Sequence, residues 1–279
     1  MLVLSHFQAA ALLQAWRLGE RSTLATPDLG LSQVSVSLDE NGTHFPPSVI
    51  LAWEVVETIA ADPNVCYRAE QGEALPIRVY SPEHDRLYSL YPTRSAPTML
   101  VSGIPMHRIK DTDPWQDTLS KIKALGTSGG RLLDTATGLG YTAILAAQNG
   151  SEVITVELDP AALEIARQNP WSQPLFAHPR IRQVIGDCCA VIAGFPEATF
   201  NRLLHDPPAF SLAGEMYSLA FYRQAYRVLK PNGRMFHYIG NPQSKSGASL
   251  TRGAAQRLRQ AGFRRVEPRP QAFGLLAFK

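Results

Sequence analysis

The stretch Arg131-Leu-Leu-Asp-Thr-Ala-Thr-Gly138-Leu-Gly140-Tyr-Thr-Ala143 decides the fold of this chain. It reads as a short apolar strand, a turn that contains glycine, and the start of a helix. Gly138 and Gly140 let the backbone turn tightly without a Cβ clash, so a ligand can approach the main chain and the amino end of the helix. The stretch therefore predicts a nucleotide pocket at the end of the first strand of an α/β sheet.

Two classes of cofactor use this arrangement. Read as Gly-x-Gly-x-x-Ala, residues Gly138, Gly140 and Ala143 fit a dinucleotide fingerprint, and Glu157 is suitably spaced to bind a ribose hydroxyl. However, an acid and two hydroxyls precede the first glycine, where a dinucleotide-binding strand normally stays apolar. Carboxylates at the strand ends would also serve a pyrophosphate poorly, because anions prefer helix amino termini and basic residues. NAD is therefore the less favoured cofactor.

The second class is indicated by acids after three successive strands. The pattern Asp134-x-x-x-Gly-x-Gly, followed by a strand that ends at Glu157 and by Ile185-Gly-Asp187, resembles the class I S-adenosylmethionine-dependent methyltransferases over residues 130–279. The resemblance implies a sulfonium cofactor whose ammonium and ribose diol suit carboxylates. The cofactor-binding residues it implies are Asp134 for the ammonium, Gly138 and Gly140 in the turn, Ala136 where many relatives carry glycine, Glu157 for the ribose hydroxyls, and Asp187 with Cys188 for the adenine.

A proline motif follows the fourth strand. Asp206-Pro-Pro-Ala-Phe210 resembles the [Asp/Asn]-Pro-Pro-[aromatic] motif of the family, with one extra residue before the aromatic. Two prolines fix the backbone and remove N–H donors, which leaves carbonyls that can accept hydrogen bonds from an amine. By resemblance, Asp206, Pro207 and Pro208 are the candidate catalytic residues that align the acceptor. The alternative is a rigid turn with a capping Asp.

Strands and helices alternate from residue 130 onward, which predicts an α/β fold with a doubly wound, seven-stranded, mostly parallel sheet that ends in an antiparallel hairpin. Residues 106–279 are expected to form this methyltransferase domain, and residues 1–105 a β-rich domain for substrate recognition. The strands expected in the sheet are 130–134, 152–157, 181–186, 200–205, 233–239, 263–267 and 272–278, with helices at 141–149, 160–168, 214–229 and 249–261.

The N-terminal residues predict a different pattern. A helix is expected over 5–18, and alternating residues with Asn41-Gly42 predict a hairpin. Pro46-Pro-Ser48 is expected to start a helix that runs to about Ala61, and short strands are expected at 65–69, 77–80 and 86–91. Asp113-Pro114 begins a further helix by the pattern of an Asp cap and a first-turn proline.

Composition narrows the choice of class. A net charge of +3 and a pI near 8.8 permit an anionic substrate without requiring one. Cys66, Cys188 and Cys189 form no sensible disulfide framework, and no metal-ligand spacing is present. The N-terminus lacks a basic leader region, and no apolar run approaches the ~20 residues of a membrane span. A cytoplasmic protein without a membrane partner is expected.

Several further residues could contribute to the site. His205, His237 and Tyr238 are expected at adjacent strand ends, where a histidine with a pKa near neutrality could act as a general base or serve as a wall residue. His107 with Arg108 could contact substrate or simply face solvent. The loop 240–247 with Lys245 and the arginines at 252, 257, 259, 264 and 265 could meet phosphate, although arginines along a helix are typical of a solvated face.

The function predicted is methyl transfer from S-adenosylmethionine to an amine, with RNA as the expected acceptor and a small-molecule amine as the alternative. Polyamine synthases of the same fold transfer an aminopropyl group from a decarboxylated cofactor and also carry an N-terminal β domain. Their acidic signature after the fourth strand is not followed by Pro-Pro-Ala-Phe, which makes them the less favoured alternative. A non-catalytic Rossmann module would require a degenerate cofactor motif, and this motif is intact.

Overall fold

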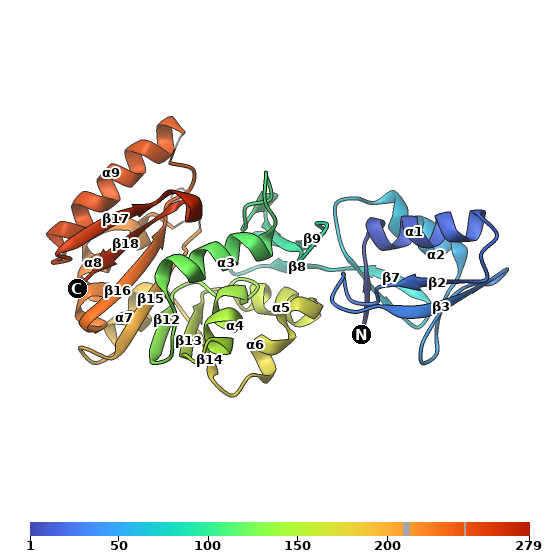
Figure 1. Cartoon of the computed structure of the whole chain (residues 1–279), viewed down its shortest axis with the longest axis horizontal. Helices are drawn as coiled ribbons and strands as arrows, with labels where there is room; N and C mark the ends of the chain where they lie inside the picture. Colours follow the sequence, from blue (N-terminus) through green and yellow to red (C-terminus); the bar gives the residue numbers. More distant parts are fainter. Residues whose placement is uncertain (209–212, 243) are drawn as a thin grey trace. The chain divides into compact units, whose positions relative to one another are not determined.

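The computed structural model describes residues 1–208, 213–242 and 244–279. The chain divides into two compact units (Figure 1). The N-terminal unit comprises Met1–Trp115 and Ala161–Gln173, and the sheet unit comprises Gln116–Pro160 and Pro174–Lys279. The domain boundary expected between residues 105 and 106 stays a prediction.

The N-terminal unit is rich in antiparallel strands, as predicted. Its core joins Leu4, Leu12, Phe45 and Ile59, so two helices pack against strands of two small sheets. The sheets have the strand orders β1-β6-β7, β2-β3-β4-β5 and β11-β10-β9-β8. The elements are β1 (Leu2–Leu4), α1 (His6–Arg17), β2 (Ser22–Ala25), β3 (Val34–Asp39), β4 (Gly42–Phe45), β5 (Val49–Leu51), α2 (Trp53–Ala61), β6 (Tyr67–Glu70), β7 (Glu73–Pro76), β8 (Arg78–Ser81), β9 (Arg86–Tyr91), β10 (Thr98–Val101) and β11 (Ile104–Pro105).

Local sequence explains part of this unit. Ser5 begins α1 because its hydroxyl accepts a hydrogen bond from Phe7 N, while the Gln8 side chain accepts one from Ser5 N. The predicted hairpin is confirmed, since Asp39 pairs with Gly42 across the turn between β3 and β4. The helix expected directly after Ser48 was wrong. Residues Val49–Leu51 instead extend the sheet as β5, and α2 begins at Trp53.

The sheet unit confirms the predicted seven-stranded sheet. Its order is β14-β13-β12-β15-β16-β18-β17, with parallel pairing from β14 to β16 and antiparallel pairing at β18 and β17 (Figure 1). The strands are β12 (Arg131–Asp134), β13 (Glu152–Glu157), β14 (Ile181–Ile185), β15 (Phe200–His205), β16 (Leu229–Tyr238), β17 (Arg265–Arg269) and β18 (Gly274–Phe278). The chain order reverses at β12, which pairs with β13 on one side and β15 on the other.

Helices connect these strands. They are α3 (Pro114–Leu125), α4 (Tyr141–Gln148), α5 (Pro160–Gln168), α6 (Gln173–Ala177), α7 (Cys188–Ala193), α8 (Leu219–Val228) and α9 (Lys245–Gln260), with 3-10 turns η1 (Pro170–Ser172), η2 (Gly214–Tyr217) and η3 (Pro270–Ala272). No helix in the described ranges combines the length and apolar character needed to cross a bilayer.

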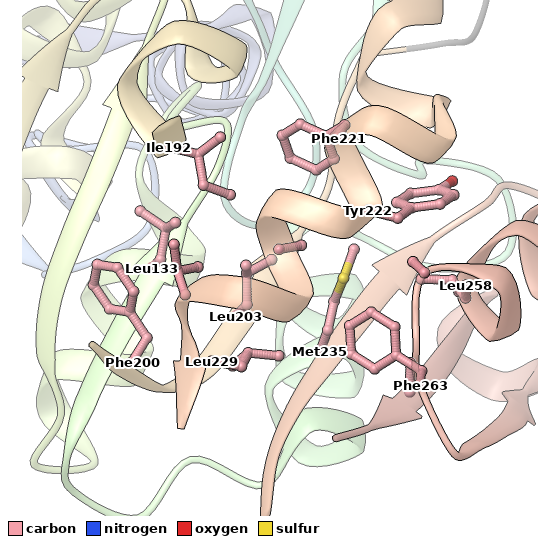
Figure 2. Packing of buried hydrophobic residues seen from close by; sticks show 14 of the residues in the cluster. Leu133, Ile192, Phe200, Leu203, Phe221, Tyr222, Leu229, Met235, Leu258 and Phe263 are labelled. Atoms are coloured by element: carbon pink, nitrogen blue, oxygen red, sulfur yellow. The ribbon is translucent and has the colours of Figure 1, made fainter. Parts of the chain in front are cut away.

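One face of the sheet carries the main core of this unit. Leu203 and Met235 point from β15 and β16 toward Phe221 of α8 and Leu258 of α9 (Figure 2). Burial of each such side chain contributes about 1.5–3 kcal/mol. Alternate residues of β16 point to the opposite face, where the ring of Tyr238 lies 4.3 Å from Lys121 Nζ of α3. One face of β16 therefore packs in the main core, and the other face lies beside α3.

Three boundary predictions in this unit were wrong. The helix expected over 214–229 is interrupted at Ser218, whose extended backbone and side-chain cap start α8. The loop expected through Gly247 ends earlier, because Ser244 caps α9 and Lys245 is its first residue. The strand expected from residue 233 begins at Leu229, and its pairing with β15 has an irregularity between Phe200 and Arg202.

Candidate active site

The candidate site lies at the carboxyl ends of the parallel strands. Asp134 ends β12, Glu157 ends β13, and Asp206 directly follows β15. Because β12 lies between β13 and β15, these side chains are brought to one edge at the reversal of strand order. Open α/β sheets bind ligands at such a point.

The glycine turn is built as the sequence predicts. Gly138 and Gly140 have φ angles of +52° and +76°, which only glycine adopts easily, and Gly140 is the N-cap of α4. A Cβ at Gly140 would also approach the Leu175 side chain to 2.7 Å. Ala136 and Gly138 are half-exposed within a turn whose other residues are buried. The backbone at these two positions is therefore accessible to a ligand.

Asp134 is fully buried below this turn. Its Oδ2 accepts hydrogen bonds from the hydroxyls of Thr142 at 2.9 Å and Thr155 at 3.1 Å, while Oδ1 has no partner within the described residues. Burial, opposed by the two hydroxyls, raises the pKa of Asp134 to about 7. Asp134 therefore fixes the base of the turn, and its role toward a methionine ammonium stays a prediction.

Glu157 joins the turn to the neighbouring strand. Its Oε2 accepts a hydrogen bond from Gly138 N at 2.9 Å, and its Oε1 accepts one from Asp159 N at 3.2 Å. The next residue, Leu158, is 44% exposed, and Ile185 of β14, which pairs with Glu157, is 57% exposed. Large apolar side chains left in solvent at strand ends, next to a carboxylate, suit a purine ring and a ribose diol.

Asp187 and Cys188 differ in what they can offer. Asp187 is exposed and caps α7 by accepting a hydrogen bond from Cys189 N at 2.9 Å. The Cys188 thiol is buried in the main core, so only the backbone of this residue can face a ligand. Burial also raises the pKa of this thiol, which makes it a poor nucleophile.

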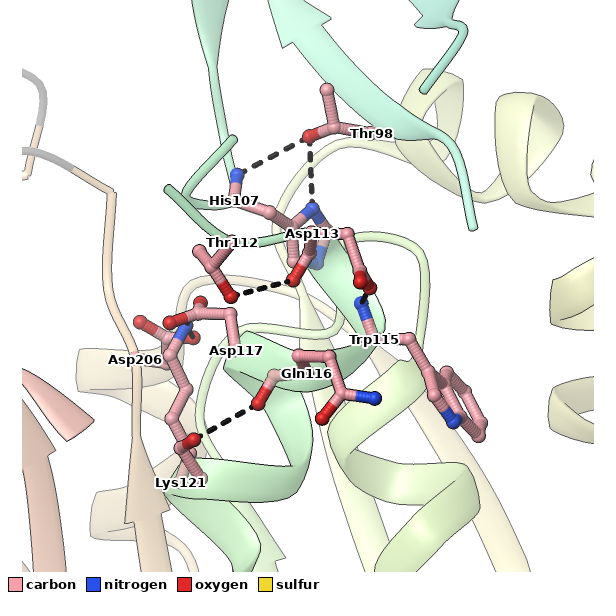
Figure 3. A network of polar contacts seen from close by, with 10 residues as sticks. Thr98, His107, Thr112, Asp113, Trp115, Gln116, Asp117, Lys121 and Asp206 are labelled. Carbon is pink, nitrogen blue, oxygen red and sulfur yellow. Dashed lines mark hydrogen bonds and ion pairs between the residues drawn. The ribbon is translucent and has the colours of Figure 1, made fainter. Parts of the chain in front are cut away.

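Asp206 is part of an ion-pair cluster that includes two residues of α3 (Figure 3). Lys121 Nζ lies 2.6 Å from Asp206 Oδ2 and 2.8 Å from Asp117 Oδ2. The side chains of Lys121 and Asp117 are 1% and 0% exposed, while that of Asp206 is 16% exposed. We call these three residues the buried triad. Asp206 is thus its one member that is accessible to an acceptor.

The charges of the buried triad depend on one another. Burial lowers the pKa of Lys121, but the negative charges of Asp206 and Asp117 raise it by more than burial lowers it. The net shift is upward, so the ammonium stays charged. Burial raises the pKa of Asp206, and Lys121 opposes that shift. With one cation between two carboxylates, the ionised triad carries a net negative charge. It can attract and orient an amine N–H donor at Asp206.

Pro207 and Pro208 continue the chain after Asp206. Pro207 is buried, and the Pro208 carbonyl accepts a hydrogen bond from the Tyr217 hydroxyl at 3.1 Å. One of the carbonyls expected to receive an amine therefore already holds an internal donor. Ala209 and Phe210, the last residues of the proposed motif, lie outside the described residues.

His205 and His237 are buried, hydrogen-bonded residues of the protein interior. His205 is fully buried, its Nε2 donates to the Met216 carbonyl at 2.9 Å, and its Nδ1 lies 2.7 Å from the Thr135 hydroxyl. Burial lowers the pKa of His205 to about 3, so the expectation of a value near neutrality was wrong. Burial also lowers the pKa of His237, whose Nε2 bonds the Tyr222 hydroxyl at 2.8 Å.

Other expected residues belong to other parts of the chain. His107 belongs to the N-terminal unit, where its Nδ1 lies 3.0 Å from the Thr98 hydroxyl. Arg108 belongs to the same unit. Arg257 points inward and donates to the Tyr217 carbonyl at 3.0 Å, so it is not part of a solvated face.

Sequence reasoning missed Lys121 and Asp117. Their i,i+4 spacing on a helix was visible, but such pairs are common on helix surfaces and give no sign of burial. Asp206 is 85 residues away in sequence, so only the fold brings it to Lys121.

Comparison with known proteins agrees with the fold of the sheet unit. Residues 132–233 match a methyltransferase domain family. Over 249 residues the chain is 43% identical to the uncharacterized protein MJ1233 of Methanocaldococcus jannaschii, covering 88% of this chain and 84% of that protein. The chain belongs to the class I Rossmann-like methyltransferases, in one family with that archaeal protein. The dinucleotide alternative is thereby set aside.

Polyamine enzymes are more distant matches. A polyamine aminopropyltransferase of Mycobacterium tuberculosis strain H37Rv is 30% identical over 141 residues, which cover 47% of this chain and 27% of that protein. The crystal structure of spermidine synthase from Thermotoga maritima superposes with a TM-score of 0.56 at 16% identity, over 72% of this chain and 70% of that one. At this identity the superposition shows a shared fold alone.

Proposed function

We propose that the sheet unit transfers the methyl group of S-adenosylmethionine to an amine positioned at Asp206. The observation that carries the proposal is the partly exposed Asp206 carboxylate of the buried triad, on the same edge as the glycine turn and Glu157. A nucleoside cofactor fits the half-exposed backbone of the turn, the Glu157 carboxylate and the apolar side chains of Leu158 and Ile185.

The residues of the chain position the reactants and supply no nucleophile. When bound, S-adenosylmethionine supplies an electrophilic methyl group on a sulfonium. Asp206 accepts an N–H hydrogen bond from the acceptor and directs its lone pair at the methyl carbon. The nitrogen would bond to the methyl carbon as the S–C bond breaks with its electron pair on sulfur, and the proton of the new ammonium would pass to solvent. Lys121 holds Asp206 in place, and such positioning accounts for most of the catalysis in a direct displacement.

The histidines do not serve as the base in this proposal. Both ring nitrogens of His205 are engaged with Thr135 and Met216, and its low pKa makes it a weak proton acceptor. An amine that is neutral when it binds needs no base before transfer, since its lone pair is already available. The rate is therefore expected to follow ionisation of the acceptor and of the buried triad, with no histidine step.

Aminopropyl transfer is the second candidate. It is supported by the similarity to polyamine aminopropyltransferases and by the net negative charge of the buried triad, which suits an alkyl ammonium ion. In that reaction the amine nitrogen would bond to the aminopropyl carbon of decarboxylated S-adenosylmethionine, the sulfonium sulfur would leave with the bonding pair as the thioether methylthioadenosine, and the amine proton would pass to solvent. The acceptor and Asp206 would have the same relation in both reactions, so the cofactor distinguishes them.

The test compares cofactors by calorimetry and then products by mass spectrometry. Methyl transfer predicts tighter binding of S-adenosylmethionine than of its decarboxylated form, and release of S-adenosylhomocysteine. Aminopropyl transfer predicts the reverse preference and release of methylthioadenosine. The protein is then incubated with S-adenosylmethionine carrying a labelled methyl group, together with RNA and pooled metabolites. The fraction that takes up the label contains the acceptor. Absence of binding by either cofactor would overturn both candidates.

A matched pair of variants tests Asp206. Asp206→Asn should reduce turnover by more than about tenfold and leave cofactor affinity within about twofold, because the residue is assigned to the acceptor. Glu197→Gln is the control, since Glu197 is exposed and precedes the other end of β15. Equal turnover in the two variants would show that Asp206 and the following prolines form a structural turn without a role in transfer.

A further inference from the structure

A charged groove lies on the α3 side of the sheet. It has a volume of about 790 Å³ and is lined by the end of α3, by β17 and η3, and by side chains of β16 and β18. Residues Arg234 of β16, Phe278 of β18 and Arg265 of β17 are in register across three strands, so their side chains emerge on the same face. We call this the edge groove. All of its lining residues belong to the sheet unit.

The lining of the edge groove is strongly basic. Four cations line it, Lys123, Arg234, Arg265 and Arg269, and Glu267 is the one carboxylate among its described lining residues. Glu267 pairs with Arg269 at 2.6 Å and with Arg265 at 3.0 Å. Such exposed pairs are worth at most about 1 kcal/mol, so they do not remove these guanidinium groups from use by a ligand. The groove keeps an excess of positive charge.

One further guanidinium group, that of Arg202, meets the groove residue Arg234 at the Gly126 end of the edge groove. Arg234 Nη2 and Arg202 Nε both donate to the Gly126 carbonyl, at 3.4 Å and 3.2 Å. Neither is paired with a carboxylate anywhere in the described ranges of the chain. Burial and then the charge of Arg234 lower the pKa of Arg202. Two like charges that converge without a paired carboxylate make this end of the groove favourable for a negatively charged group.

The other end of the edge groove leads toward the buried triad. Arg269 pairs with Gly274, and Gly274 pairs with Tyr238, so these three residues are in register across β17, β18 and β16. The Tyr238 ring contacts Lys121, the partner of Asp206. From Arg234 to Tyr238 the strand rises about 13 Å, which matches the spacing of about four stacked nucleotides at ~3.4 Å each.

We propose that the edge groove binds the phosphodiester backbone of a single-stranded nucleic acid whose base amine is presented to Asp206. The inference rests on the proposed amine transfer for the identity of the reacting group, but phosphate binding stands on the groove alone. Arginine forks match phosphate oxygens in a bidentate manner. Phe278 is half-buried and adds apolar surface among the cations, with its ring centroid 3.9 Å from Arg265 Cζ, and a ribose or a base can pack beside it.

The experiment measures binding of fluorescently labelled RNA and DNA oligonucleotides of one sequence to the full chain by anisotropy, without cofactor. Wild-type affinity should fall steeply as salt rises from about 50 to 200 mM. The double variant Lys123→Glu/Arg265→Glu should bind at least about tenfold more weakly, with the salt slope reduced by about two. A preference between the two oligonucleotides identifies the source of the strand.

The control carries a charge change at another exposed arginine. Arg252 lies on α9 and is not one of the residues that line the edge groove. The affinity of the Arg252→Glu variant for the oligonucleotides should therefore stay within about twofold of wild type. Thermal melts verify that all variants fold. Equal losses in the control and the double variant, or no binding of either oligonucleotide at low salt, would overturn the proposal. Cofactor calorimetry reports on the proposed function separately, so the two failures are distinguishable.

Discussion

Replacing the buried cation is the most informative perturbation of the sheet unit. Lys121→Met keeps most of the volume of the side chain and leaves Asp117 and Asp206 without the charge that now lies 2.8 Å and 2.6 Å from them. Breaking a buried pair in this way costs about 3–5 kcal/mol, because an uncompensated carboxylate remains inside the protein. For a unit of this size, that loss lowers the melting temperature by about 6–20 °C.

The pH dependence of this loss has a definite sign. Without Lys121, burial keeps the folded-state pKa of Asp206 above that of the unfolded chain. The folded variant then binds more protons, so its deficit shrinks as the pH falls and grows as the pH rises. Denaturant unfolding followed by circular dichroism at several pH values measures both the size and the sign of the effect.

Two comparisons make the argument refutable. Lys123→Met, on the same helix but exposed, should change stability by no more than about 0.5 kcal/mol. Adding Asp117→Asn and Asp206→Asn to Lys121→Met should recover more than half of the lost stability, because the uncompensated charges are then gone. Equal effects of the two lysine variants, or no recovery in the triple variant, would refute the account of the buried triad.

Three further predictions concern the cofactor edge. Glu157→Gln should weaken binding of the nucleoside cofactor by about 2 kcal/mol in calorimetry, since a charged acceptor for two hydroxyls is lost. Gly140→Ala should destabilise the protein by about 1–3 kcal/mol in denaturant unfolding. A φ of +76° is strained for alanine, and the added Cβ would approach the Leu175 side chain. In thermal melts, Asp134→Asn should gain stability relative to wild type as the pH rises from 4 to 7. The pKa of Asp134 is about 7 in the folded protein and lower in the unfolded chain, so protonation stabilises the folded wild type at low pH. That stabilisation is lost as the pH rises to 7, whereas Asn does not titrate.

The sheet could be predicted because its information is local. Strands such as Glu152–Glu157 are apolar runs bounded by turns, and the glycine turn after Asp134 specifies its own backbone. The positions of Glu157 and Asp206 at one edge then follow from the parallel pairing of the strands. These parts needed no knowledge of side-chain packing.

The errors arose where distant pairing outweighs local preference. Ser48 is a good helix cap, but Val49–Leu51 gain more by pairing with β4, so the helix begins later. Ser218 interrupts an otherwise helical pattern by acting as a cap itself. Lys121 was missed for the same reason, since its burial depends on a partner that local sequence does not contain.

Helix α3 uses two sides at once, and this restricts how its length can change. Asp117 and Lys121 meet Asp206, whereas Ser120, Lys123 and Ala124 line the edge groove. One residue inserted after Asp117 would turn every later side chain by about 100° around the helix axis. Lys121 would move away from its two carboxylates, and the edge groove would lose Lys123, one of its four cations, through the same insertion. Insertions and deletions should therefore be far less tolerated in α3 than in exposed turns such as the one at Asn41 between β3 and β4.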